Sequence, residues 1–451
     1  MKQHEHRGVS FGTILMLLLT TAVLGCSIVV LPRLMGTANI HMHDRAMLSS
    51  MNLNEALPEL TMSVIPIAAE TETPQVTEVP TVKPVPAPQA TEVPVLAQEP
   101  DVTGTVQLTF AGSVNMDDLT RKSGYYSDTE KYDFTENLAL IAGELDSDYT
   151  MVTLEAITDE SGNVRQIPNA PHEAMDMLSA ANVDMVALGY NRALERGMNG
   201  AKETIAQAQA RGLETLGLYD SAEDAQRLRM VQIGEVKVAY LHYTTAITST
   251  AKRKMNADDA AYAQPLTSIS SGADVITADI ADARQSGANI VIVCINWSGE
   301  DGINTTSTKM KNFTQALADA GADVIVGSGT KAVKEVTWIM GKRSDGTTRQ
   351  TLCAWSLGSL LNGERGNGNV TGMILHLQLS VSGDAVSFAR VSYTPTYIWR
   401  FKQDDQYRYR VVASDLPAPE GMDESQAANA ERAFENLKKN LGSSPVTLRT
   451  K

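Results

Sequence analysis

Apolar residues follow two alternating spacings between residues 106 and 330. Stretches with helical spacing, such as residues 274–288 (DVITADIADARQSGA), each end at a small or turn residue. Each of them leads into a short apolar run, such as residues 289–297 (NIVIVCINW). This order predicts an α/β domain in which helices cover a buried sheet.

The pattern changes after residue 330. Residues 332–340, 351–358 and 369–383 have the spacing of strands, and no long helix separates them. The second half of the sheet system is therefore predicted to be antiparallel or mixed. Near the C-terminus, helical spacing returns between Asp423, a typical N-cap, and Gly442, a typical stop, which predicts a closing helix.

An uncharged apolar run extends from Ser10 to Leu31. About 20 apolar residues suffice to cross a bilayer as a helix. Lys2 and Arg7 precede the run, and this charge bias favours an N-terminus on the inside. We expect a single-pass anchor in the cell membrane with the C-terminal domain outside. The alternative is a lipoprotein signal ending at Cys26, although the apolar run continues beyond that cysteine.

A segment rich in Pro, Thr and Glu follows, from Glu70 to Pro100, and it contains no glycine and no helical period. Such a composition favours an extended linker that buries no core. We therefore divide the chain into a cytoplasmic N-terminus (1–9), a transmembrane anchor (10–31), a juxtamembrane segment (32–69), a linker (70–104), a folded domain (105–415) and a C-terminal helix and tail (416–451).

Composition excludes some functions. The chain has 451 residues and a formal net charge of −15, which argues against a nucleic-acid partner. Cys294 and Cys353 both lie in apolar runs typical of strands, so we expect buried free thiols. A disulfide between neighbouring strands is the alternative.

Turns follow the predicted strands in a recognisable order. They read AGSVNMDD (111–118), TLEAI (153–157), GYNRALERG (189–197), NWSGE (296–300), GSGTKAV (327–333) and WSLGSL (355–360). Between Val106 and Ile398 the chain resembles the CapA family of capsule (poly-γ-glutamate) synthesis proteins. The resemblance implies a metallophosphatase-like layered α/β/β/α sandwich with mixed sheets, preceded here by a transmembrane helix. The glycines of the motifs match this family: Gly112, Gly197, Gly327 and Gly358.

The metal-binding side chains of that family do not match. Aspartates of its motifs correspond to Ser113 and Glu195, and its histidines correspond to Arg192, Asn296, Ser328, Gly329 and Lys331. Divalent ions need carboxylate oxygens or neutral imidazole nitrogens at close range, and most of the replacements offer neither. We expect no metal and no cofactor, and we assign no catalytic residue.

Six residues remain as candidates for a cleft or ligand-binding site: Glu155, Asn191, Arg192, Trp297, Glu300 and Lys331. Carboxylates at strand ends line clefts in such sheets, although Glu155 is equally suited to accept hydrogen bonds from turn amides. Trp297 is equally suited to cap the core. Lys252, Arg253 and Lys254 follow a strand toward the same edge, and a run of three charges is usually a solvated loop.

Three functions are compatible with these residues. The first is a non-catalytic accessory protein that contacts an anionic polymer, poly-γ-glutamate, or the membrane subunits of a capsule synthase. The second is a metal-dependent hydrolase or phosphoesterase with a rearranged site that uses Asp117, Asp118, Glu155 or Glu300. The third is a structural cell-surface domain. The replaced ligands favour the first.

Overall fold

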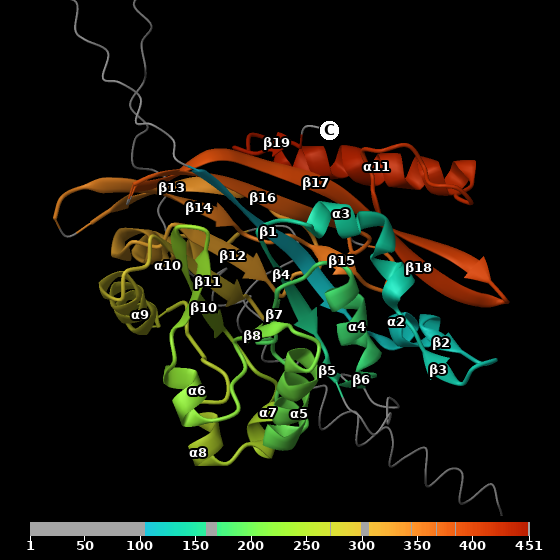
Figure 1. Cartoon of the computed structure of the whole chain (residues 1–451), viewed down its shortest axis with the longest axis horizontal. Coiled ribbons are helices and arrows are strands. Elements are labelled where there is room, and N and C mark those ends of the chain that lie inside the picture. The colour runs from blue at the N-terminus through green and yellow to red at the C-terminus, as the bar shows by residue number, and fades with distance from the viewer. Residues whose placement is uncertain are drawn as a thin grey trace, which may run out of the picture. The chain divides into compact units, whose positions relative to one another are not determined.

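The computed structural model describes residues 104–158, 169–270, 272–298, 306–343, 345–366, 368–383 and 385–449. Within these residues the predicted mixed α/β fold is confirmed (Figure 1). The predicted anchor, residues 10–31, lies outside them, as does nearly all of the linker. In the described part, no helix combines the length and the apolar character needed to cross a membrane.

The first sheet has nine strands and runs in the order β18-β17-β16-β1-β4-β7-β8. Its strands are β1 (Gly104–Asn115), β4 (Tyr149–Glu155), β7 (Met185–Ala187), β8 (Glu214–Leu216), β16 (Thr371–Ser382), β17 (Ala385–Gln403) and β18 (Gln406–Ala413), with β15 (Ser359–Leu361) beside β1 and β19 (Thr447–Leu448) beside β17. The strands β1, β4, β7 and β8 are parallel, whereas β16, β17 and β18 are antiparallel, as the change of pattern predicts.

The second sheet has six strands in the order β13-β14-β12-β11-β10-β9. They are β9 (Arg229–Ile233), β10 (Val236–Thr244), β11 (Ile290–Asn296), β12 (Val324–Ser328), β13 (Val336–Lys342) and β14 (Thr348–Ala354). The four central strands are parallel, and β9 and β13 are antiparallel edges. Two small sheets pair β2 (Tyr125–Tyr126) with β3 (Lys131–Tyr132) and β5 (Ile157–Thr158) with β6 (Asn169–Ala170).

The two sheets pack face to face and carry helices on their outer faces. Apolar residues of both sheets, such as Phe110 and Ile292, share one buried core. A second core joins the first sheet to α4 (Glu173–Ala180) and α5 (Gly197–Gln209). A third joins the second sheet to α9 (Ala273–Gln285) and α10 (Thr308–Ala320), so the domain has four layers, α/β/β/α.

The closing helix is confirmed as α11 (Glu424–Leu441). Asp423 forms a capping box with Gln426 at its start, and Gly442 follows its end. Its buried residues pack on β17 and β18, where Figure 1 shows it lying along the first sheet. Cys294 and Cys353 are buried free thiols, as the sequence indicates.

Two segments differ from their sequence pattern. Residues 136–145, which have helical spacing, form the 3-10 turns η1 (Thr135–Asn137) and η2 (Ala139–Ile141) and the short α3 (Ala142–Leu145). There the buried Asn137 amide donates to the Tyr409 carbonyl, so a tertiary contact outweighs helical propensity. The basic run near residue 252, expected as a loop, is the helix α7 (Ser249–Lys254), which the Thr248 hydroxyl caps.

The remaining helices are α2 (Asp118–Ser123), α6 (Ala222–Gln226) and α8 (Ala257–Ala260). All three helices lie in connections between strands. The helices α6 and α8 are at the lower side of the view in Figure 1.

Candidate functional site

The carboxyl ends of the parallel strands bring the candidate residues together. Asn115 at the end of β1 is in register with Glu155 at the end of β4, and Asn296 at the end of β11 is in register with Ser328 at the end of β12. Because the sheets pack face to face, the end of β4 approaches the turn after β12, where Lys331 lies. Strand ends of this kind are where α/β sheets usually place ligands.

Glu155 is the carboxylate at the centre of this arrangement. Protein atoms closely surround its carboxyl group, although part of the side chain is accessible to solvent. Burial raises the pKa of Glu155, while the charge of Lys331 and a hydrogen bond from Ser113 act in the opposite direction. The neighbouring Tyr190 is buried, and burial followed by the charge of Glu155 raises its pKa well above the usual value.

Arg192 is held by its own turn. Its guanidinium pairs with the Glu195 carboxylate at 2.9 Å, and Glu195 accepts a second hydrogen bond from the Thr248 hydroxyl at 2.8 Å. The backbone amide of Thr248 also donates to the Asn191 carbonyl at 2.9 Å. The turn after β7 is therefore tied to the start of α7, and Arg192 enters the site as half of an ion pair.

Lys331 is also paired. Its ammonium lies 2.7 Å from a Glu364 carboxylate oxygen, and about half of the Glu364 side chain is exposed, 53%. Exposed pairs of this kind are weak and easily screened by salt. Lys331 thus faces one carboxylate at the surface and a second, Glu155, in the interior.

The turn after β12 keeps a tight backbone path without reactive side chains. The Asn296 amide donates to the Ser328 hydroxyl at 3.2 Å, and the Ser298 hydroxyl donates to the Asn296 side-chain oxygen. Gly329 has a positive φ of 89°, and a Cβ there would lie 2.9 Å from that same oxygen. Asn296, Ser328 and Gly329 all correspond to motif histidines. The side chains of Asn296 and Ser328 therefore bond to each other, and Gly329 leaves no room for a side chain.

Trp297 does not line a cleft, which corrects its assignment as a site residue. Its side chain is 1% exposed and packs with Phe313 and Trp355 in the core between the second sheet and its helices. Its indole N–H donates to the Trp355 carbonyl at 3.2 Å. Because the ring is apolar and its N–H already has a hydrogen-bond acceptor, it is stable in this core. Glu300 lies outside the described residues.

The carboxylates Asp117 and Asp118 have structural partners. Asp117 caps α2 by accepting from the amides of Leu119 and Thr120, and its other oxygen accepts from Gly363 at 2.8 Å. Asp118 pairs with Arg121. The carboxylates of both aspartates are therefore bonded to protein groups at or beside the start of α2.

The histidines of the domain are dispersed. His376 is buried between the hydroxyls of Thr109 and Thr394, and His242 is buried against the glycine turns after β7 and β8. Within the part of the chain that the structure describes, no group of three His, Cys, Asp or Glu side chains is placed to hold a metal ion.

Sequence reasoning missed two members of the site. Tyr190 directly precedes Asn191 in the motif GYNRALERG, so its place in that motif could have indicated that it lies at the site. Glu364 gave no such signal, since it follows the last motif in a loop and meets Lys331 only in the folded chain.

The fold is a mixed α/β sandwich in which the candidate polar residues lie at the carboxyl ends of parallel strands. Comparisons with known proteins show which family it belongs to. A family model described as bacterial capsule synthesis protein PGA_cap matches residues 107–364. Because the match covers more than half of the chain, the protein belongs to this family.

Two curated relatives are CapA proteins. The capsule biosynthesis protein CapA of Bacillus anthracis is 28% identical over 162 residues, which are 35% of this chain and 37% of that protein. The PGA biosynthesis protein CapA of Bacillus subtilis (strain 168) is 25% identical over 187 residues, 40% of this chain and 47% of that protein. The matches thus span less than half of either relative's length.

Among solved structures, this chain is similar to a calcineurin-like phosphoesterase from Bacillus subtilis. Its TM-score is 0.35 at 11% sequence identity, and the match covers 74% of this chain and 99% of that one.

The buried Glu155 predicts a pH-dependent stability. Its pKa in the folded chain lies above the ordinary value of 4.5, so the folded state binds the proton more readily than the unfolded state. Stability from this group is therefore lost as the pH rises above that value. We expect Glu155→Gln, which still accepts from Ser113, to match the parent at pH 4 and to be more stable than the parent at pH 7.5 in urea unfolding.

Glu235→Gln is the matched control, because Glu235 is exposed in the turn between β9 and β10. A Glu155→Gln variant that differs from the parent by the same free energy at both pH values would show that burial does not govern this carboxyl group.

Proposed function

We propose that this protein is a non-catalytic accessory protein of capsule polymer synthesis, anchored in the cell membrane with its domain outside. Membership in the capsule synthesis family supports the process. The metallophosphatase-like layering expected from the resemblance supports taking the strand ends as the place where a related protein would hold metal.

One observation carries the non-catalytic role. The positions that correspond to metal ligands hold Ser113, Arg192, Asn296 and Lys331, and their polar groups bond to neighbouring side chains of the protein itself. The cationic side chains of Arg192 and Lys331 also offer no lone pair with which to bind a divalent ion. The rearranged hydrolase also loses Asp117 and Asp118, which cap α2 or pair within it.

A specific feature nevertheless favours testing for hydrolysis. Glu155 combines a raised pKa with a neighbouring lysine and tyrosine, and perturbed carboxyl groups of this kind cluster in active sites. The rearranged hydrolase is therefore the second candidate function.

The first test measures metal and hydrolysis together. We expect the purified protein to carry no stoichiometric Mn, Fe, Zn or Mg by elemental analysis, and to leave generic phosphoesters intact. The physical reason is the replacement of carboxylate and imidazole ligands by hydroxyl, amide and cationic groups. About one or more tightly bound metal ions per chain, or turnover that Glu155→Gln abolishes, would establish the hydrolase instead.

Arg192 and Lys331 are proposed to contact the carboxylates of the anionic polymer, poly-γ-glutamate. Arginine offers a planar fork that matches a carboxylate, and lysine acts as a point charge. In the free protein Arg192 is paired with Glu195 and Lys331 with Glu364. A carboxylate of the polymer would therefore have to replace a carboxylate of the protein in each ion pair. The net charge of −15 makes any such binding local and dependent on salt.

The second test removes the cations and their competitors separately. We expect Arg192→Ala with Lys331→Ala to weaken poly-γ-glutamate binding roughly two- to tenfold at low salt, the range of exposed ion pairs. Glu364→Gln removes the charge of the surface partner of Lys331 and is expected to strengthen binding. Fluorescence anisotropy of labelled polymer measures both effects.

The matched control is Lys237→Ala with Lys342→Ala, which removes two exposed cations at the opposite ends of the strands. Polymer binding that responds equally to both double variants, or to neither, contradicts a cationic contact at the strand ends.

Membrane attachment is tested on intact cells. Protease added outside is expected to release a soluble domain by cutting within residues 70–100, because that composition favours an open linker. Cys26→Ser leaves attachment intact if residues 10–31 span the membrane, and abolishes it if a lipid on Cys26 is the anchor. A domain that stays protected until the cells are lysed contradicts the proposed topology.

A further inference from the structure

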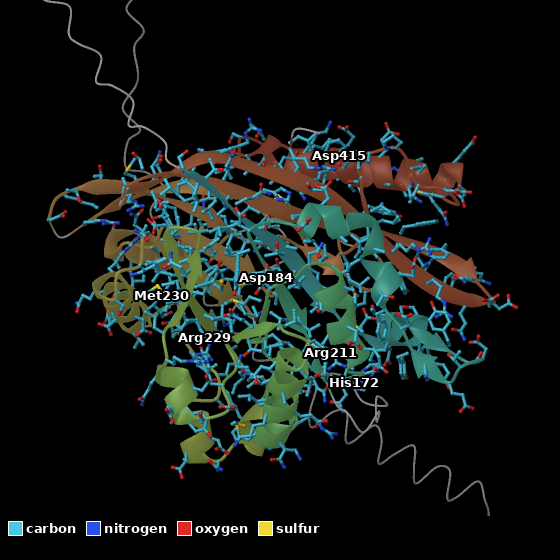
Figure 2. All side chains as sticks on the ribbon, viewed as in Figure 1. His172, Asp184, Arg211, Arg229, Met230 and Asp415 are labelled. Atoms are coloured by element: carbon cyan, nitrogen blue, oxygen red, sulfur yellow. The ribbon has the colours of Figure 1, made fainter. Side chains whose placement is uncertain are left out.

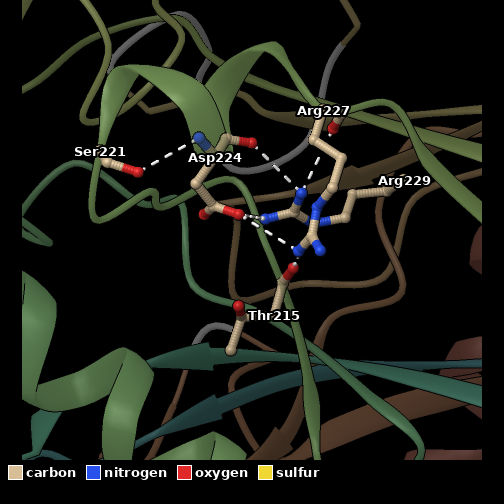
Figure 3. Close-up of polar contacts among 5 residues, drawn as sticks. All are labelled: Thr215, Ser221, Asp224, Arg227 and Arg229. Carbon is tan, nitrogen blue, oxygen red and sulfur yellow. Dashed lines mark hydrogen bonds and ion pairs between the residues drawn. The ribbon is translucent and has the colours of Figure 1, made fainter.

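A wide groove beside β10, at the edge of the second sheet, contains arginines that the protein itself already engages. The groove encloses about 1350 Å³ between β10, the segments around α6 and α8, and one side of α9. Arg229, labelled in Figure 2, lies over the Tyr219 ring and donates to the Thr215 carbonyl at 3.3 Å. It also donates to the Asp224 carboxylate at 2.8 Å, which Arg227 shares at 3.2 Å (Figure 3). Both guanidinium groups are therefore bonded within the fold.

The carboxylates of this groove are Asp258, Asp279 and Asp282. Asp279 accepts a hydrogen bond from the Tyr243 hydroxyl, and Asp258 and Asp282 are exposed. Carboxylates that face solvent are expected on a chain with a net charge of −15, so we place no ligand there.

A smaller pocket beside α11 has the opposite character. It encloses about 360 Å³, with one wall formed by α11 and the other by Val333, the segment before β16 and Tyr397 of β17. None of the described residues lining it is an aspartate or a glutamate, although the chain has 53 of these against 38 lysines and arginines. Two arginines line it, Arg365 and Arg432. The pocket is therefore a locally positive place on an acidic protein.

Arg365 is held in place by neutral groups. Its guanidinium donates to the Ile398 carbonyl at 2.8 Å and to the Tyr397 hydroxyl at 3.3 Å, and it lies 5.8 Å from the centre of the Tyr397 ring. A guanidinium has five N–H donors, so most of them remain available. The fold thus presents an oriented fork of donors at the pocket.

Arg432 reaches the same pocket from α11. Within the described residues its guanidinium donates one hydrogen bond, to the Asn429 side-chain oxygen at 3.1 Å. No carboxylate of the described residues lies within ion-pair distance of Arg365 or Arg432. At the strand ends, by contrast, Arg192 and Lys331 each have such a partner. An anion that enters this pocket therefore displaces no carboxylate of the protein.

Amide side chains continue the α11 wall of the pocket beyond Arg432. Asn436 and Asn440 lie four and eight positions further along, on the same face of the helix. Both are exposed, and neither forms a side-chain hydrogen bond with a described residue. An asparagine amide donates and accepts at once, so it can pair with an amide of a ligand. Ala433 and Leu437 are buried beside them and form an apolar floor that suits short carbon segments.

The pocket begins where the proposed polymer contact at Lys331 ends. Ala332 and Val333, which line the pocket, directly follow Lys331 in the chain. Arg365 directly follows Glu364, the residue that pairs with Lys331 at 2.7 Å. A chain molecule whose carboxylate replaces Glu364 at Lys331 is therefore adjacent to Arg365.

We propose that this pocket binds a stretch of γ-linked glutamyl units, with their carboxylates at Arg365 and Arg432 and their amides at Asn436 and Asn440. The proposal rests on the function proposed above, contact with this polymer, and it extends that contact into a track along α11. Arginine forks match planar carboxylates. Phosphate polymers satisfy the arginines but have no amide for the asparagines, and they are the competing anion in the test.

The test measures binding of labelled poly-γ-glutamate to the purified full-length chain by fluorescence anisotropy at low salt. Arg432→Gln removes one cation and Asn436→Asp adds an anion beside it, and we expect each to weaken binding about two- to fivefold, the range of one exposed ion pair. Arg365→Gln with Arg432→Gln is expected to weaken it roughly five- to tenfold. Arg432 and Asn436 are exposed on α11, so their single variants decide the matter if the loss of Arg365 destabilises the fold.

Lys439→Gln is the matched control, because Lys439 is an exposed cation of α11 that does not line the pocket. It is expected to leave binding unchanged. Equal effects of Lys439→Gln and Arg432→Gln overturn the pocket, while the strand-end contact stands if Arg192→Ala with Lys331→Ala weakens binding. A response to Arg432→Gln and Asn436→Asp alone supports the pocket and contradicts the strand-end contact. A parent protein that binds no polymer overturns both.

Unlabelled competitors identify the chemistry of the ligand. Penta-γ-glutamate is expected to displace the labelled polymer more strongly than a polyphosphate of similar length at equal total charge. Equal competition by the polyphosphate shows attraction of anions alone and overturns the proposal. Equal competition by α-linked pentaglutamate assigns the pocket to acidic peptides instead of the capsule polymer, and so overturns it as well.

Discussion

Face-to-face packing of the two sheets is the interaction on which the remaining structure depends. The core between them excludes water from apolar residues of both sheets, such as Leu108 and Val324. Because the central strands of each sheet are parallel, this packing also fixes where their carboxyl ends lie. Glu155 from one sheet and Lys331 from the other are far apart in sequence, yet the charge of Lys331 acts to lower the pKa of Glu155. The site is thus a consequence of how the core is built.

Close backbone approaches explain why the family's glycines remain when its ligand side chains do not. A Cβ at Gly112 would lie 2.5 Å from the Gly358 carbonyl oxygen, and one at Gly327 would lie 2.0 Å from that of Trp355. Any larger residue would push these segments apart. Ser113 and Lys331 do carry side chains, and both of these side chains interact with Glu155. Sequence motifs therefore report the scaffold at some positions and the chemistry at others.

The sequence predicted what local pattern and capping determine. Buried runs such as residues 290–296 became strands, and Asp423 with Gly442 delimited the last helix. It failed where contacts distant along the chain decide. Trp297 follows a strand in a family motif, and only packing against Phe313 shows that its ring belongs to the core. The pairing of Lys331 with Glu364 and the groove beside β10 likewise come from segments joined by the fold.

The two polar regions of the domain satisfy their charges in opposite ways. At the strand ends each cation meets a carboxylate, as Arg192 meets Glu195, so the region is nearly neutral without a ligand and a partner must compete for it. In the groove beside β10, the guanidinium of Arg229 is bonded within the protein, whereas no cation of the described residues pairs with Asp279. Any anionic partner at the strand ends would therefore have to compete with the carboxylates of the protein itself, whereas the aspartates of the groove are balanced only by solvent.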